Sequence, residues 1–414
     1  MGRKRSYRRW TQDEKNTIIE AGIEYGPTLA AKHCSEKFGH AVSKQLVSTY
    51  VNKYQESCEK KDAPIPGRPT KASPICDRLL CEHIKALYKE ESPITINIVI
   101  GAAIALFALY DRTLLKETTA GASWVKSVLK RCKIKSYVYI PSQKVRYTSK
   151  KRQEKETRSF FRDICIIVYR SPKAIQNTLI LNIDQIQIEI IPAAGNLPRQ
   201  ILTILLGMSM SGDLLPLQVI YIGTNKYCLP TLIFPSDWHV TYNASGLSNT
   251  DTMLLYNTEI LIPYIEQAKG NANIPQAQET LLILDRYTPH KSKAFKSSLE
   301  GANISYCYIP SGKTKIYQPV DAKNSAEEYF KNEIDKKFQD HYASLTSDAL
   351  ERKSRGEEHW IPELDLSVFT ENTTKWIQEI FLSLKSKKSM LKQAWVETNI
   401  KTTIEDHSKY KNNN

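Results

Sequence analysis

The sequence predicts a multidomain protein in which an all-α N-terminal region precedes an α/β domain with a mixed sheet. Residues 1–158 contain 31 of the 58 Lys and Arg residues but only 16 of the 44 Asp and Glu residues, so the whole positive excess lies in this part. From residue 178 onward, apolar runs typical of buried strands alternate with amphipathic helical patterns. At 414 residues the chain is long enough for two or three domains with full cores.

The first 56 residues are predicted to form a helical module. Thr11 has the sequence context of a helix N-cap, and Gly26, followed by Pro, interrupts the helix that it starts. Gly39 supplies a turn before a third helix at 44–54. Three helices with a tight turn before the last are typical of a helix-turn-helix, although a three-helix bundle with a polar surface is the alternative. We assign residues 1–56 to a first helix-turn-helix module on this pattern.

Polar side chains able to contact phosphates or base edges are expected on the third helix and in the basic arm that precedes the first. On the third helix they are Lys44, Gln45, Ser48, Thr49, Asn52 and Lys53. In the arm they are Arg3, Lys4 and Arg5, and the same residues could instead form a nuclear-localisation signal. The charge asymmetry favours the reading as a nucleic-acid interface, because excess positive charge on one part of a chain is typical of phosphate-backbone binding.

Residues 57–74 contain four Pro residues, which exclude a helix and predict a linker. Arg68 lies between Gly and Pro and suits insertion into a minor groove, with a plain flexible linker as the alternative. Residues 75–140 are assigned to a second helix-turn-helix module, and 141–177 to a basic connector. The helices of the second module are expected at 76–90, 94–110 and 122–131, and its candidate contact residues are Lys126, Lys130, Arg131 and Lys133.

The α/β domain is expected to span residues 178–341, followed by a helical and polar tail over 342–414. The last eight residues of the tail, HSKYKNNN, are predicted to be disordered. The predicted strands are 178–191, 200–210, 214–222, 280–285 and 304–309. The predicted helices are 249–268, 291–300 and one that begins near residue 322. This alternation predicts a mixed sheet with helices on both faces.

Three acidic residues follow apolar strands in this domain. Asp285 ends the run LLIL, Asp184 ends a similar run, and Asp321 follows an extended segment that a Pro terminates. Between Asp285 and Asp321 stand 35 residues. Acids at the carboxyl ends of buried strands meet at the edge where open α/β sheets carry their sites, so paired metal-binding carboxylates are predicted. For any one of these residues, capping of the following turn is the alternative.

In this context the acids resemble the triad of a DDE-type transposase of the pogo/Tigger/Jerky-like branch. The blocks that carry the resemblance are NIDQ (182–185), SGDLLPLQVIYIG (211–223), LSNTDTM (247–253), LILDRYTPH (282–290) and YQPVD (317–321). They occur in the family's order and cover roughly residues 178–340. The linker and the helical patterns before them resemble the helix-turn-helix region of centromere-protein-B-like proteins.

The resemblance implies a ribonuclease H-like fold and cleavage or joining of DNA phosphodiesters with two Mg²⁺ or Mn²⁺ ions. Asp184 would bridge both ions, with Asp285 and Asp321 each completing one. His290 matches a His of the family and is expected either to form a local hydrogen bond or to assist catalysis. The implied partners are double-stranded DNA with terminal repeats and, as an option, a second copy of the chain. The implied location is the nucleus.

Three departures from the family bear on activity. Ile186 stands where a Thr is common, and residues 195–203 are shorter than the segment that relatives place before the second strand. The sequence YNASGL (242–247) stands where a His-Trp pair is usual. The alternative function is therefore a domesticated or decayed copy that acts only as a sequence-specific DNA-binding protein. A weaker alternative is a structural ribonuclease H-like domain with RNA as its partner. Loss of the second strand would favour the non-enzymatic reading.

Composition excludes several other classes. No apolar run reaches the ~18–20 residues needed to span a bilayer, and no membrane partner is expected. The N-terminus lacks the apolar stretch of a secretory signal. The eight Cys residues are scattered without zinc-ligand spacing, which predicts free thiols in a reducing compartment.

Overall fold

The computed structural model describes residues 10–52, 73–90, 92–110, 121–134, 150–171, 173–191, 200–356 and 361–412. The chain divides into two compact units, Met1–Lys71 and Ala72–Asn414, each described below by itself. Among the described residues no helix has the length and apolarity needed to cross a bilayer. The described cysteines are free thiols, as predicted.

The first unit contains the three predicted helices. α1 (Gln12–Phe38) starts with a capping box between Thr11 and Glu14, and Gly26 (φ 77°, ψ 162°) interrupts its helical geometry as predicted. The last described helix of the unit covers residues 44–52. A Cβ at Gly22 would lie within 2.6–2.7 Å of the side chains of Val47 and Val51, so glycine allows close packing of α1 against this helix.

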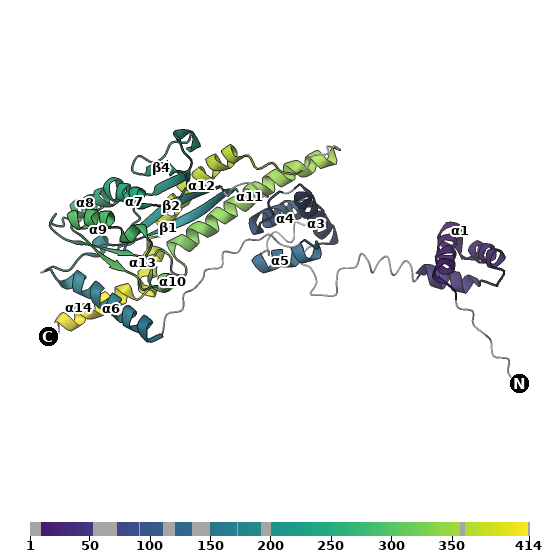
Figure 1. Ribbon diagram of the computed structural model, residues 1–414, viewed down its shortest axis with the longest axis horizontal. Coiled ribbons are helices and arrows are strands. Elements are labelled where there is room, and N and C mark those ends of the chain that lie inside the picture. The colour runs from purple at the N-terminus through teal and green to yellow at the C-terminus, as the bar shows by residue number, and fades with distance from the viewer. Residues whose placement is uncertain are drawn as a thin grey trace. The chain divides into compact units, whose positions relative to one another are not determined.

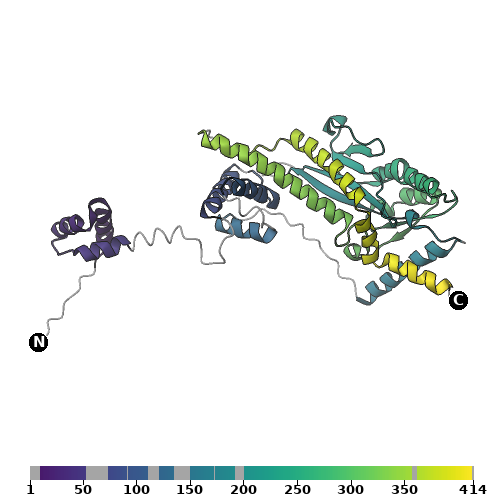
Figure 2. The same cartoon turned by 180° about the vertical axis from the view of Figure 1, so that it is seen from behind.

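The second unit is built on one six-stranded sheet (Figures 1 and 2). Its strands are β1 (Ile180–Ile191), β2 (Gln200–Ser209), β3 (Gln218–Ile222), β4 (His239–Asn243), β5 (Thr280–Leu284) and β6 (Ile304–Tyr308). The order is β4-β3-β2-β1-β5-β6, and β2 alone is antiparallel to its neighbours. An antiparallel β1-β2-β3 meander extended by two strands parallel to β1 is the ribonuclease H-like arrangement, which confirms the predicted fold class.

β2 is complete and pairs with β1 along nearly its whole length. Of the shortened segment at 195–203, residues 195–199 lie outside the described residues, and residues 200–203 form the start of β2. The second strand, whose loss would have favoured the non-enzymatic reading, is therefore present. β4 was not predicted, because its sequence HVTYN is short and only partly buried. The predicted strand 214–222 contracts to β3, with a single bridge between Met208 and Leu214 in place of a regular ladder.

Helices cover both faces of the sheet (Figure 1). The described helices of the second unit are α3 (Pro74–Lys89), α4 (Ile96–Tyr110), α5 (Ala122–Arg131), α6 (Lys150–Tyr169), α7 (Thr250–Tyr256), α8 (Ile262–Asn271), α9 (Lys293–Gly301), α10 (Thr314–Tyr317), α11 (Ala326–Ser354), α12 (Leu366–Ser386), α13 (Lys388–Glu397) and α14 (Ile400–Asn412). Gly207 of β2 faces Tyr256 of α7, whereas Tyr221, on the face of its partner Leu202, hydrogen-bonds Thr374 of α12. Since side chains alternate between faces along a strand, α7 and α12 cover opposite faces.

The second predicted helix-turn-helix region does not form a compact unit of its own. α4 packs along α11, where Asn97 donates to Asp335 at 2.8 Å and accepts from Gln339 at 2.9 Å. Gly101 lies so close to α11 that a Cβ there would be 2.8 Å from the Gln339 carbonyl oxygen. The described helices α3, α4 and α5 therefore belong to the same unit as the sheet.

Two predictions about the connecting and terminal segments need correction. Residues 150–169 of the predicted basic connector form helix α6, whose Phe160 is buried against the sheet domain. Residues 407–412 of the predicted disordered end belong to α14. α14 packs on α6, with the Tyr169 hydroxyl donating to the Ile404 carbonyl at 2.8 Å. Apolar residues at helical spacing in both segments (Phe160, Ile164, Ile400 and Ile404, all buried) supply the packing that orders them.

Replacing Gly101 by Ala in the full chain should lower the free energy of unfolding by about 1–3 kcal/mol, because the new Cβ would overlap the α11 backbone. Urea-induced unfolding followed by circular dichroism measures the change. Gly270→Ala is the matched control, since a Cβ at this helical glycine meets nothing within 4 Å. It should be neutral or stabilise by up to about 1 kcal/mol. Equal effects of the two substitutions would contradict the close approach of α4 and α11.

Candidate active site

The sheet register brings two of the predicted acids together. β1 and β5 run parallel with Ile180 opposite Leu281 and Asn182 opposite Ile283. Continuing that register by two residues places Asp184 opposite Asp285. Asp285 directly follows β5, whereas Asp184 is the fifth of the twelve residues of β1 and so lies within that strand, not at its carboxyl end as predicted. Residues 180–183 of β1 and 280–284 of β5 are all buried, the polar side chains of Asn182 and Thr280 included, and this burial on both faces fixes the register.

The third acid is delivered by the loop between α10 and α11. The buried Asn182 side chain donates from Nδ2 to the Ile283 carbonyl of β5 and accepts at Oδ1 from the Val320 N–H, both at 2.9 Å. In the same loop Gln318 donates to the Ile183 carbonyl at 3.3 Å. These contacts hold the residue before Asp321 against β1, so the Asn of NIDQ and the Gln of YQPVD serve to position the acids.

His290 orients Asp285. Its Nδ1 lies 2.7 Å from Asp285 Oδ1 and its Nε2 lies 2.9 Å from Nε2 of Gln185. Since an amide nitrogen donates, Nε2 of the ring accepts and Nδ1–H donates to the carboxylate. The ring is fully buried and stacks on Phe295. The predicted local hydrogen bond of His290 is thus present, and the last residue of NIDQ completes it.

A fourth acid, which sequence reasoning missed, lies in the site. Glu327, in the first turn of α11, is 8% exposed. It offers an oxygen within 4.8 Å of ligand oxygens of Asp184 and Asp321, a group that Asp285 does not join. Its sequence context Ser-Ala-Glu-Glu is ordinary for a helix start, so the available signal pointed to capping. The only additional hint was its spacing of six residues after Asp321.

The carboxylates strongly affect one another. Burial, followed by the charges of Glu327, Asp285 and Asp321, raises the pKa of Asp184 well above its ordinary value, against a hydrogen bond from the Gln185 N–H. Burial and then Glu327 raise the pKa of Asp321 to about 7, which Lys315 and Lys331 partly oppose. Crowded carboxylate oxygens with so little compensating positive charge fit a hard divalent cation such as Mg²⁺.

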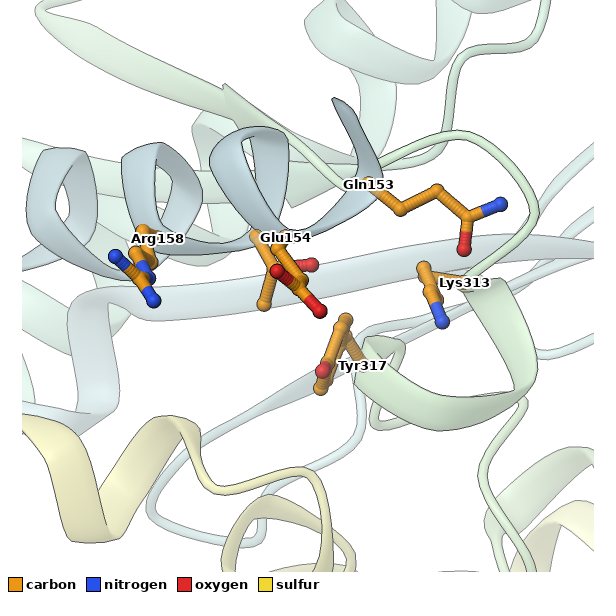
Figure 3. Close-up of a pocket in the computed structure, with 6 residues that line it drawn as sticks. Gln153, Glu154, Arg158, Lys313 and Tyr317 are labelled. Atoms are coloured by element: carbon orange, nitrogen blue, oxygen red, sulfur yellow. The ribbon is translucent and has the colours of Figure 1, made fainter. Parts of the chain in front are cut away.

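A groove of about 370 Å³ borders the loop that carries Asp321 (Figure 3). Its lining residues are Gln153, Glu154, Thr157 and Arg158 of α6 with Lys313 and Tyr317 at α10. The Tyr317 ring packs against Phe160 and Phe161, with ring centroids 6.2 and 5.2 Å away, so α6 is anchored on this loop. The groove thus brings together Arg158 of α6 and Lys313, with the Glu154 side chain also in its lining.

Most of the predicted contact residues that the structure describes are exposed, whereas Arg131 is held in an ion pair. Lys44, Gln45, Thr49, Asn52, Lys126, Lys130 and Lys133 are exposed, and Ser48 is partly buried. Arg131 is engaged by the Asp77 carboxylate at 2.5 Å and by Ser127 at 3.0 Å, so its guanidinium braces α5 on α3. Arg3, Lys4, Arg5, Lys53 and Arg68 lie outside the described residues.

Residues 199–357 match the family model described as DDE superfamily endonuclease. The match includes Asp285, Asp321 and Glu327, whereas Asp184 lies before it. A search of curated proteins finds no match.

The solved structures that are similar include a pre-cleavage Mos1 transpososome (11% identity, 92% of this chain, 98% of that chain, TM-score 0.30). A Mos1 mariner paired end complex with Mn (13%, 92%, 98%, 0.27) and the catalytic domain of Mos1 mariner transposase (10%, 59%, 98%, 0.28) are also similar.

Replacing Asn182 by Ala should lower the free energy of unfolding by about 2–4 kcal/mol, because the buried Ile283 carbonyl and Val320 N–H both lose their partner. Chemical denaturation of the full chain measures this. Asn225→Ala is the control, because this side chain accepts an exposed hydrogen bond from the Tyr227 N–H. Its loss should lower the free energy of unfolding by less than about 1 kcal/mol. A loss of similar size in both variants would show that Asn182 does not tie the loop to the sheet.

Proposed function

We propose that this chain is a transposase, or a protein derived from one, of the pogo/Tigger/Jerky-like branch. It binds double-stranded DNA at terminal repeats and cleaves or joins phosphodiesters in the nucleus. The observation that carries the proposal is the convergence of Asp184, within β1, with Asp285 and Asp321 beside the carboxyl end of β5 in a ribonuclease H-like sheet. The match of residues 199–357 to a DDE superfamily endonuclease supports it independently of this geometry.

In the proposed reaction the oxygen of water or of a 3′-hydroxyl forms a bond to phosphorus while the bond to the leaving 3′-oxygen breaks. Two divalent cations, when bound, neutralise the phosphoryl oxygens and make the attacking oxygen more acidic. The carboxylates of Asp184 and Asp321 would hold one ion and those of Asp184 and Asp285 the other. Asn182 and His290 keep the carboxylates in place, through the Val320 N–H and the Asp285 side chain respectively.

The groove between α6 and α10 supplies a path for the flanking strand. Arg158 and Lys313 line it, and exposed Lys315 lies near enough to Asp321 to affect its pKa. Positive side chains at this position can pair with backbone phosphates on either side of the reacting one. The contact set of the first unit and the exposed lysines of α5 would add duplex binding by helix-turn-helix contacts.

Wild-type protein with Mg²⁺ or Mn²⁺ should nick a duplex that carries the terminal repeats of its own element, and Asp285→Ala should abolish nicking. Removing one carboxylate of a two-ion site leaves an ion without a ligand and should reduce the rate by at least about 10³-fold. Gel analysis of end-labelled DNA measures the rate, with Asp251→Ala, a first-turn acid of α7, as control.

Repeat-specific binding by the wild type without nicking would instead support the alternative function, a domesticated DNA-binding protein. Stronger competition by RNA than by DNA in the same assay would favour the RNA alternative.

DNA affinity should fall steeply with salt, and Lys44→Gln should reduce the slope of log affinity against log salt by about 0.9, the value for one phosphate contact. Fluorescence anisotropy of labelled duplex at several salt concentrations measures the slope. Lys226→Gln removes an exposed charge from the loop after β3 and should leave the slope unchanged. An unaltered slope for Lys44→Gln would remove this residue from the interface.

A further inference from the structure

Two adjacent glutamates begin α11 but do different things. Glu328 is exposed and serves the helix end, since its carboxylate accepts from the Asn324 N–H at 2.7 Å and its N–H is capped by Ser325. Glu327 is buried and takes no part in this cap. Its N–H is fixed by the Val320 carbonyl at 3.1 Å, one residue before Asp321. The need for a helix cap therefore does not explain why a second acid is buried here.

The Glu327 side chain faces the catalytic carboxylates. One of its carboxylate oxygens lies within 4.8 Å of a carboxylate oxygen of Asp184 and of one of Asp321. Its cationic partner is Lys331, one turn later on α11, whose side chain is half exposed. A single exposed ammonium is a weak counterion for three carboxyl groups, because solvent screens it and holding a lysine in place costs side-chain entropy.

We propose that Glu327 is a further carboxylate ligand of the divalent-cation site and that Lys331 competes with the cation for it. The inference rests on the proposed function, since it concerns the same site. Asp184, Asp321 and Glu327 would together supply hard oxygen donors to one ion, and the Glu327–Lys331 pair separates when that ion binds. This role differs from that of Glu328, which takes part only in the N-terminal cap of α11.

Mn²⁺ binding to the full-length protein tests this without any catalytic readout. Titration followed by electron paramagnetic resonance or calorimetry should give a Kd for Glu327→Gln about 10- to 100-fold above the wild-type value, the range for changes at or next to a metal ligand. The amide keeps the size and hydrogen-bonding capacity of the carboxyl group. Glu328→Gln, which changes the adjacent exposed glutamate, should leave the Kd unchanged.

Lysine variants separate competition for Glu327 from general electrostatics. Lys331→Gln and Lys315→Gln each remove one positive charge near Asp321, but only Lys331 pairs with Glu327. Both should tighten Mn²⁺ binding, and Lys331→Gln should tighten it several-fold more. If the pair has only a structural role, Glu327→Gln and Lys331→Gln will both lower the melting temperature and neither will shift the Kd beyond the change in Lys315→Gln.

Each outcome decides a different point. Equal Kd values for wild type and Glu327→Gln, together with equal effects of the two lysine variants, overturn the inference and leave the proposed function standing. An absence of Mn²⁺ binding by the wild type overturns both. If Glu327→Gln does not fold, the comparison of Lys331→Gln with Lys315→Gln still decides, since equal tightening by these two counts against competition for Glu327.

Discussion

The site depends on one buried amide. Asn182 donates to a carbonyl of β5 and accepts from the backbone of the loop before Asp321, and so links three segments that are distant in sequence. A carboxylate could not replace it, because it has no N–H for the β5 carbonyl, and an apolar residue would leave both backbone groups unsatisfied. The positions of the acids follow from this link and from the parallel register of β1 and β5.

The acid site also illustrates how function competes with stability. Burial of these carboxyl groups, and then the repulsion between them, raises the pKa values of Asp184 and Asp321. Three features hold the carboxyl groups together in spite of this repulsion. They are the buried strands β1 and β5, the hydrogen bonds of Asn182, and the hydrogen bond between His290 and Asp285. Perturbed acids held by a rigid scaffold are typical of catalytic sites.

Much of the sheet domain was predictable because its signals are local. Runs of buried, mostly apolar residues predicted β1 and β5, and the Pro before Asp321 marked its loop. Asp285 follows its strand as predicted, whereas Asp184 lies inside β1. β4 was missed because this short edge strand is partly exposed to solvent and its sequence shows little alternation of apolar and polar residues. Glu327 was missed because its position in the site depends on how the first turn of α11 is oriented toward β1, and the local sequence does not determine this orientation. The order of α6 and α14 was missed because it depends on tertiary packing, including the contact of the two helices with each other between residues more than 200 positions apart.

The packing of α4 on α11 has a mechanical consequence. The first turn of α11 contributes Glu327 to the acid cluster. Fifteen residues later, Tyr342 of the same helix contacts α3, where its hydroxyl lies 3.4 Å from Nε2 of His83. At 1.5 Å per residue, these two points are separated by roughly 22 Å of continuous helix. A helix of this kind transmits displacement with little loss, unlike a linker. The spacing between α3–α5 and the reacting centre is therefore a property of the fold, and a ligand that pulled on those helices would pull on the first turn of α11 as well.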